Sequence, residues 1–229
     1  MMKNKTFPWI KNRYKKLGLA TLLFCVPLMT TAAEIIQIKG HATAASINQI
    51  QSLKVGDQIK HGQLLSSDAT GYVWLKLDDG GNLLMRPNTE IIIQNFTFNP
   101  DADSSSAVFR LNRGGVRILN QLNDDLDVIY KFITDVGTID FYGGSFQARL
   151  CKSDCDNLYP AATDGLYLGV EDGEIEFRNY SGNMTIEPGQ FSYAANGKQQ
   201  PQIHATLPSP LKQDPMPSAD PFKQADKDS

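Results

Sequence analysis

The stretch GYVWLKLDDGGNLLMRP, residues 71–87, shows the pattern that decides the fold. In its first half, residues 72–77, apolar Val and Leu side chains occupy every second position, which is the period of a β-strand. Asp79 and Gly80 follow, and an Asp-Gly pair between two such runs is typical of a tight turn. The stretch therefore predicts a β-hairpin.

The same pattern recurs along the rest of the chain, and no window shows a sustained helical period. The other strand-like runs are EIIIQNFTF, AVFRLNRGGVRIL, DVIYKFITDVGTIDF, SFQARLC, GLYLGVEDGEIEFRN and GNMTIEPGQFSYAANG. Gly-Gly at 114–115 and Asp-Gly at 172–173 predict two further hairpins. We expect an all-β fold, an antiparallel sandwich or roll of about ten to twelve short strands.

Residues 1–33 have the layout of a secretory signal peptide: a basic start, an apolar run and a patch of small residues. We expect cleavage after Ala33 and export to the periplasm, while an uncleaved membrane anchor is the open alternative. Cleavage removes six of the 22 Lys and Arg residues and none of the 25 Asp and Glu residues, which changes the net charge from −3 to −9. Such an acidic chain argues against nucleic acid or an anionic membrane as partner. No later apolar run is long enough for a membrane helix.

The compartment also determines how the cysteines are interpreted. Cleavage of the leader removes Cys25, so the mature chain keeps two cysteines, Cys151 and Cys155. In an oxidising compartment two cysteines this close are most simply one disulfide. A redox site usually has two intervening residues and a helix N-terminus, and neither feature is present in this pattern. We expect a structural disulfide and no free thiol.

No motif in the sequence predicts catalysis, a metal or a cofactor. The three histidines lie far apart, and no serine-nucleophile, Walker or dinucleotide motif occurs. The loop NPDADSSS resembles the start of a calcium-binding loop but lacks its central glycine and final glutamate. A hydrolytic pair of carboxylates, distant in sequence, stays open as an alternative. We expect a protein that is not an enzyme.

The composition changes at Thr206, where proline and scattered charges replace the alternating pattern. A segment with so few apolar residues cannot offset the entropy lost on ordering. We therefore predict a leader at 1–33, one β domain at 34–205 and a disordered tail at 206–229.

The order of motifs resembles the FecR-domain family of bacterial extracytoplasmic proteins. LKVGDQIKHGQLLSSDATGYVWLKLDDGGNLLMRPNTEIII, residues 53–93, is similar to the family's opening block. TDVGTIDFYGGSFQARLCKSDC, residues 134–155, is similar to its later block, as are DGLYLGVEDGEIEFRNYSG and IEPGQFSYA. Where the family commonly has GIRGT, this chain has DFYGG at 140–144, so Tyr142 replaces an arginine and any binding role of that arginine is not carried over.

The resemblance implies a β-rich periplasmic module, used in ligand sensing or in signalling between an outer-membrane transporter and a sigma factor. Its signalling members carry a cytoplasmic domain ahead of a membrane helix, and only about 16 residues precede the apolar run here. We therefore expect a stand-alone secreted module without the sigma-factor role.

Two functions follow as hypotheses. The first is a binding or adaptor module for an envelope protein, using strand edges and loops. The second is a sensor or carrier of a small ligand, an iron chelate or a glycan, in a cleft lined by aromatic residues drawn from Tyr72, Trp74, Phe141, Tyr142, Tyr167 and Tyr193. Candidate binding residues are Arg86, Arg113, Arg117, Tyr142 and Tyr159.

The residues that we expect in turns are Gly56, Asp57, Asp79, Gly80, Gly143, Gly144, Gly173 and Gly189.

Overall fold

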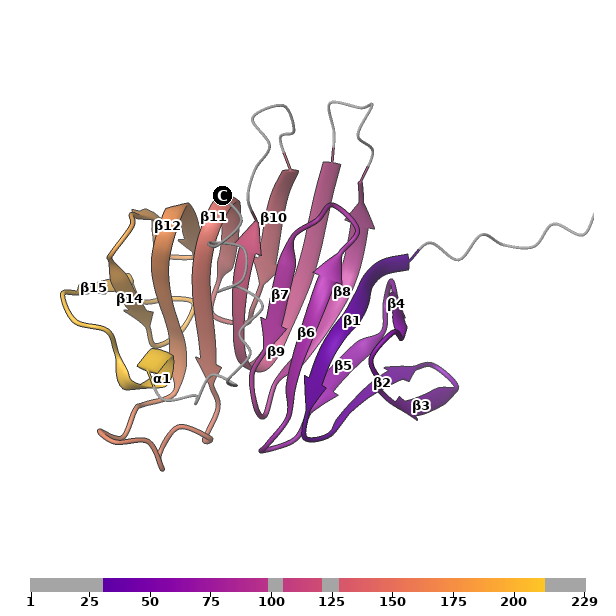
Figure 1. The fold of residues 1–229 in the computed structure, drawn as a ribbon. Helices are drawn as coiled ribbons and strands as arrows, with labels where there is room; N and C mark the ends of the chain where they lie inside the picture. Colours follow the sequence, from indigo (N-terminus) through magenta and orange to yellow (C-terminus); the bar gives the residue numbers. More distant parts are fainter. Residues whose placement is uncertain (1–30, 99–104, 121–127, 213–229) are drawn as a thin grey trace, which may run out of the picture.

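The computed structural model describes residues 31–98, 105–120 and 128–212, and these residues form β-strands almost throughout (Figure 1). The strands are β1 Thr31–Lys39, β2 Ala42–Ser46, β3 Gln49–Ser52, β4 Gln58–Lys60, β5 Leu64–Ser67, β6 Tyr72–Leu77, β7 Asn82–Met85, β8 Glu90–Thr97, β9 Ser105–Asn120, β10 Val128–Ile133, β11 Thr138–Cys151, β12 Gly165–Asn179, β13 Gly182–Ile186, β14 Phe191–Ala194 and β15 Gln202–His204. One helical turn, α1, covers Ser209–Lys212. The predicted all-β class is confirmed.

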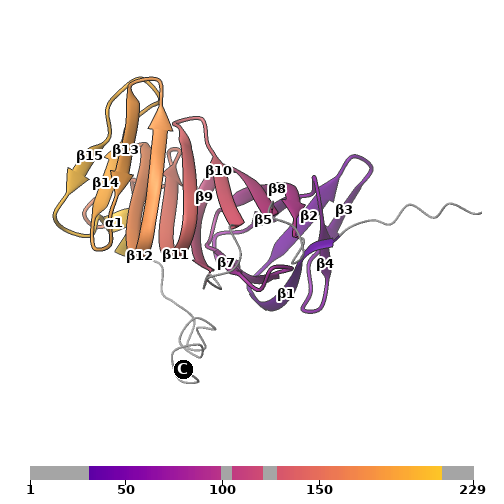
Figure 2. The ribbon, with the colours of Figure 1, turned by 90° about the horizontal axis from the view of Figure 1, so that it is seen from above.

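All the strands belong to one open sheet, with the main order β15-β14-β12-β11-β10-β9-β7-β6-β1-β4. The sheet contains more strands than the ten to twelve expected, and it is mixed, since β10 runs parallel to the first half of β9. Strand β9 pairs with β8 through its first half and with β7 through its second half. The sheet therefore folds over at β9, and the core lies between its two layers (Figures 1 and 2).

Glycines bend the three longest strands where the sequence predicted turns. The Gly-Gly pair at 114–115 lies inside the 16-residue strand β9, and Gly173 lies inside the 15-residue strand β12. Gly144 in β11 faces Gly173 in the register, and the pairing shifts on both sides of this point. Both residues have positive φ, +100° and +71°. The two expected hairpins and the turn at Gly143–Gly144 are therefore irregularities within continuous strands, because a bulge and a tight turn share the need for positive φ.

The other expected turn residues lie in turns. Gly56 and Gly189 occupy turns with φ of +87° and +79°. The Asp57 carboxylate accepts a hydrogen bond from the backbone N–H of Lys54 at 2.8 Å. Asp79 and Gly80 lie in the turn that joins β6 to β7, so the predicted hairpin is present.

The two ends of the described chain extend the β domain. Strand β1 starts at Thr31, and Ala33, after which cleavage is predicted, is buried opposite Leu77. The site of cleavage stays a prediction. At the other end, residues 206–212 fell within the predicted tail, yet Leu211 is buried and the Ser209 hydroxyl donates to the Pro160 carbonyl at 2.7 Å. The rest of that tail, 213–229, lies outside the described residues. Among the residues that the structure describes, no helix has the length and apolar character to cross a membrane.

Asp79 anchors the β6–β7 turn to the core, and its titration gives the first testable prediction. The buried Tyr130 hydroxyl donates to the Asp79 carboxylate at 2.5 Å. Burial raises the pKa of Asp79 above 3.8, and the Tyr130 hydrogen bond opposes that rise only in part. A raised folded-state pKa stabilises the fold at low pH, and this contribution is lost as pH rises through the folded-state pKa.

We therefore expect the stability of the natural protein, relative to an Asp79→Asn variant, to fall as pH rises above 3.8. Asparagine does not titrate, and its carbonyl still accepts from Tyr130. Urea unfolding of both proteins across the acid range measures the difference. A difference that stays constant or grows with pH would contradict the raised pKa.

Candidate functional site

The outer face of the sheet, opposite the main core, carries an unusual row of side chains. The register places Gly169 of β12 beside Gln147 of β11, and Gln147 beside Arg117 of β9. Arg117 in turn lies beside Leu84 of β7, and Leu84 beside Trp74 of β6. Five strands thus contribute to one continuous row. We define the arginine–aromatic face as Trp74, Leu84, Arg86, Arg117, Gln147 and Arg149.

Two buried arginines lie next to this row, on either side of Gly115. A Cβ placed on Gly115 would lie 3.0 Å from Cδ of Arg86 and 3.1 Å from Cδ of Arg149, so the glycine makes room for both aliphatic stems. Arg86 donates from Nη2 to the Gln147 side-chain oxygen at 2.6 Å. Arg149 donates from Nη1 to the Pro87 carbonyl at 3.2 Å.

Two carboxylates accompany the three arginines. Asp154 accepts from Arg149 at 3.0 Å, and the two side chains are only 11% and 6% exposed. Glu171 accepts from Arg117 at 2.6 Å and from the Ser145 hydroxyl at 3.1 Å. The face thus holds three guanidinium groups, two of which pair with a carboxylate next to the face, on a protein whose net charge is negative.

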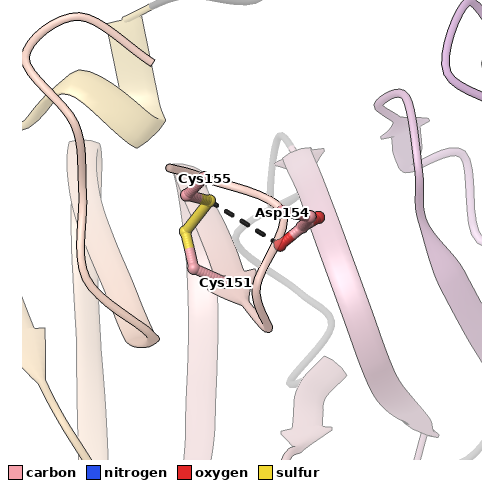
Figure 3. Close-up of side chains that lie close together, drawn as sticks. All are labelled: Cys151, Asp154 and Cys155. Atoms are coloured by element: carbon pink, nitrogen blue, oxygen red, sulfur yellow. Dashed lines mark hydrogen bonds between the residues drawn. A yellow bond between two sulfur atoms is a disulfide. The ribbon is translucent and has the colours of Figure 1, made fainter. Parts of the chain in front are cut away.

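The disulfide holds the loop that supplies Asp154 (Figure 3). Cys151 ends β11, and its sulfur is bonded to that of Cys155. Between them, Asp154 also accepts from the backbone N–H of Lys152 at 2.8 Å. The predicted disulfide is therefore present, and it closes the short loop that carries the carboxylate paired with Arg149. Cys151, Asp154 and Cys155 lie within metal-binding distance of one another, but the two sulfurs are already bonded to each other.

An aromatic cluster forms the other end of the face. The rings of Tyr72 and Trp74 stack at 6.0 Å, and Leu84 and the half-buried Leu119 pack against them. Trp74 is 1% exposed, and its indole Nε1–H is buried without a hydrogen-bond acceptor among the described residues. A buried indole N–H usually has a partner, so this donor points to an acceptor from elsewhere.

The predicted binding residues separate into two groups. Arg86 and Arg117 meet on the arginine–aromatic face. Arg113 lies in β9 opposite Glu90, while Tyr142 in β11 is 41% exposed and Tyr159, in the loop after the disulfide, is 89% exposed. These three do not join the face.

Sequence reasoning missed Gln147 and Arg149. Both alternate with apolar residues in the strand-like run SFQARLC, and this alternation places them together on the outer face. The pattern could have shown that they share a face. Only the pairing of β11 with β9 shows that the face also holds Arg117.

The aromatic residues proposed to line a ligand cleft do not come together. Phe141 lies in the main core, Tyr72 and Trp74 in the outer cluster, and Tyr167 packs on Tyr193 at 4.7 Å. Two surface hollows lie elsewhere among the described residues. One, of about 620 Å³, is lined by Thr31, His61, Asp78, Asn95, Phe96, Thr97 and Phe98. The other, of about 410 Å³, is lined by residues 134–138 and 178–180.

No family model matches the chain, and no curated protein matches it. Two crystal structures of a "putative anti-sigma factor" from Parabacteroides distasonis are similar, with 15% and 13% identity and TM-scores of 0.48 and 0.47. Each alignment covers 62% of this chain and 58% of the other, so the match spans less than two thirds of either protein.

Proposed function

We propose that this chain is a non-enzymatic, FecR-like binding or adaptor module of the periplasm, and that its arginine–aromatic face binds an acidic, extended segment of an envelope protein. The observation that carries the proposal is the row from Gln147 through Arg117 to Trp74, with Arg86 and Arg149 buried beside it. The motif order of residues 53–194 and the leader-like residues 1–33 support the family and the compartment.

The chemistry of the face fits such a partner. Arginine side chains bind carboxylates through paired N–H donors, and their planar groups stack on extended peptide. The Trp74 indole N–H provides a further donor for a backbone carbonyl. A buried arginine also loses little conformational entropy when it binds, because packing already fixes its stem.

Strand addition at a sheet edge, the mode expected from the sequence, fits less well. The edge strands β15 and β4 have three residues each, β3 has four and β13 has five. Short edge strands are one means by which proteins limit pairing with another chain. The outer face is therefore a better recognition surface than the edges of the described sheet.

Photo-crosslinking in cells tests the proposal. A photoreactive amino acid at Gln37, which lies beside Trp74 in the register, should give one crosslinked product with an envelope protein. Arg117→Glu in the same chain should lower the yield about tenfold, because it reverses a charge on the face. The matched control is the same photoreactive residue at Tyr180, which is 92% exposed in the β12–β13 turn, and it should give no such product.

A crosslink of equal yield from both positions, or one that survives Arg117→Glu, would contradict binding at this face. The absence of any envelope product from Gln37 would do the same. The products are identified by mass spectrometry after purification through a tag.

One observation favours a second function, the sensing or carriage of a small ligand such as an iron chelate or a glycan. The hollow of about 620 Å³ combines Phe96 and Phe98 with the polar side chains of His61, Asp78 and Asn95. Aromatic rings with a few polar groups are typical of small-ligand sites. Saturable thermal stabilisation by a chelate or an oligosaccharide, lost on Asn95→Ala, would favour this function over the adaptor.

A further inference from the structure

The larger hollow, of about 620 Å³, lies where the start of β1, the β4–β5 turn and the end of β8 come together (Figure 1). Thr31 of β1 pairs with Lys60 of β4 in the register. Gly62 of the β4–β5 turn donates from its backbone N–H to the Ile93 carbonyl of β8 at 2.9 Å. Backbone hydrogen bonds therefore hold these elements together. The volume falls within the range of about 300–1,000 Å³ that is typical of small-molecule sites.

A β-bulge in β8 determines which side chains reach the hollow. Ile91 and Ile93 are buried, so strict alternation would also bury Asn95. The register with β9 shifts between Ile93 and Asn95, and beyond this shift Asn95 is exposed while Phe96 is only 6% exposed. One strand thus supplies the hollow with both a polar group and an aromatic ring.

Two phenylalanine rings give the hollow an apolar surface. Phe96 packs edge to face on the buried Tyr130, with the ring centroids 6.5 Å apart. Phe98 is half-buried and packs against the main core. Because packing already fixes both rings, they lose little conformational entropy when a ligand binds on them.

The polar groups of the hollow include an acceptor and donors that have no partner among the described residues. Asp78 accepts from the Thr31 hydroxyl through Oδ2 at 3.2 Å, and no group of the described chain donates to its Oδ1. The Asn95 side chain makes one long contact, at 3.5 Å from the Thr97 hydroxyl to Oδ1, and its amide N–H groups have no acceptor in the described chain. A ligand that displaces water from these groups has to offer acceptors and donors together.

We propose that the hollow binds a neutral saccharide, which packs a pyranose ring on Phe96 and Phe98 and pairs its hydroxyls with Asp78 and Asn95. A pyranose carries C–H groups on its faces and hydroxyls around its edge, and each hydroxyl both donates and accepts. The negative face of an aromatic ring attracts the slightly positive C–H groups. The inference rests on the second function proposed above, a small ligand in this hollow, and names the class of that ligand.

The lining disfavours the two simple alternatives. An anionic iron chelate would meet the Asp78 carboxylate, and no Lys or Arg is among the described residues that line the hollow. A cationic amine offers donors only, so it would leave the amide N–H groups of Asn95 without an acceptor. A hydroxyl-rich neutral ligand satisfies both side chains.

Isothermal titration calorimetry of the purified protein tests the proposal, with maltotriose, cellotriose and tri-N-acetylchitotriose as probes. We expect saturable binding of at least one of them at a single site. Asn95→Ala should weaken this binding about tenfold, because it removes a hydrogen-bonding side chain. Phe98→Leu should weaken it several-fold, because it removes the ring and keeps an apolar side chain. Gln94→Ala is the matched control: Gln94 is exposed beside Asn95 but does not line the hollow, so binding should not change.

Asn95→Asp separates the classes of ligand. The carboxylate has the shape of the amide but no donor, so binding of the saccharide should fall about tenfold. A cationic amine would instead bind more tightly beside two carboxylates. Spermidine and ferric nitrilotriacetate are the cationic and anionic probes, and we expect neither to bind in the hollow.

Three results would overturn the proposal. The first is that none of the three saccharides binds. The second is saccharide binding that Asn95→Ala and Phe98→Leu leave unchanged in proteins with the natural circular dichroism spectrum. The third is binding of spermidine or the chelate that depends on Asn95 while no saccharide binds.

The same data separate this inference from the proposed functions. If only the chelate binds in the hollow, the sensor function stands and the saccharide inference fails. If a saccharide binds and no envelope protein is crosslinked from Gln37, the adaptor function fails and the inference stands. Gln37 lies beside Trp74 on the outer face and does not line the hollow, so the two experiments report on different surfaces.

Discussion

Replacing Gly173 by alanine is expected to lower the free energy of unfolding by about 3 kcal/mol or more. The glycine has φ of +71°, and a Cβ there would lie 1.9 Å from the Gly143 carbonyl oxygen. The obstacle is backbone, so a side-chain rotation cannot relieve it. The pairing of β11 with β12, the most extensive in the sheet, must shift instead. Urea unfolding followed by circular dichroism measures the loss, and failure of the variant to fold would be the extreme form of the same result.

Gly189→Ala is the matched control, because it separates backbone strain from overlap. Gly189 has a similar φ of +79°, but nothing lies within 4 Å of its missing Cβ. Only the cost of positive φ remains, about 1 kcal/mol. Equal losses at the two sites would show that the close approach of β11 to β12 contributes nothing.

These glycines also show how far sequence reasoning reaches. Period-two alternation predicted the all-β class and located most strands, because the alternation is a local property of each strand. The dipeptides Gly114–Gly115 and Asp172–Gly173 predict hairpins but lie within strands, because bulges and tight turns both require positive φ. Whether the chain reverses or only bends there depends on neighbouring strands, and those neighbours lie elsewhere in the sequence.

The candidate site shows the same limit at the level of side chains. Arg86 and Arg117 could be selected from the sequence as cations near glycines. Their relation to Gln147, which is 61 residues from Arg86, depends on the register between β9 and β11. Local patterns show which side of a strand a residue occupies, but the rows that cross a sheet arise only when the strands pair.

Replacing Arg149 by leucine is expected to cost about 3 kcal/mol of stability, since it leaves the Asp154 carboxylate, which is only 11% exposed, without its cation. Arg117→Leu is the matched control on the same face: its partner Glu171 is 38% exposed, so water can solvate the carboxylate that remains, and the expected loss is below about 1 kcal/mol. Urea unfolding of both variants gives the comparison, and similar losses would show that the burial of Asp154 has no energetic consequence.

A double-mutant cycle with Asp154→Leu then tests the role of the disulfide. Removing both members of the pair should recover much of the loss, because no buried charge remains. Repeating the cycle with Cys151→Ser/Cys155→Ser should lower the coupling between Arg149 and Asp154, since the loop no longer fixes the carboxylate. An unchanged coupling would mean that the disulfide stabilises the end of β11 without positioning Asp154. A lower coupling would make the disulfide part of the support of the arginine–aromatic face, and the integrity of that face would then depend on an oxidising compartment.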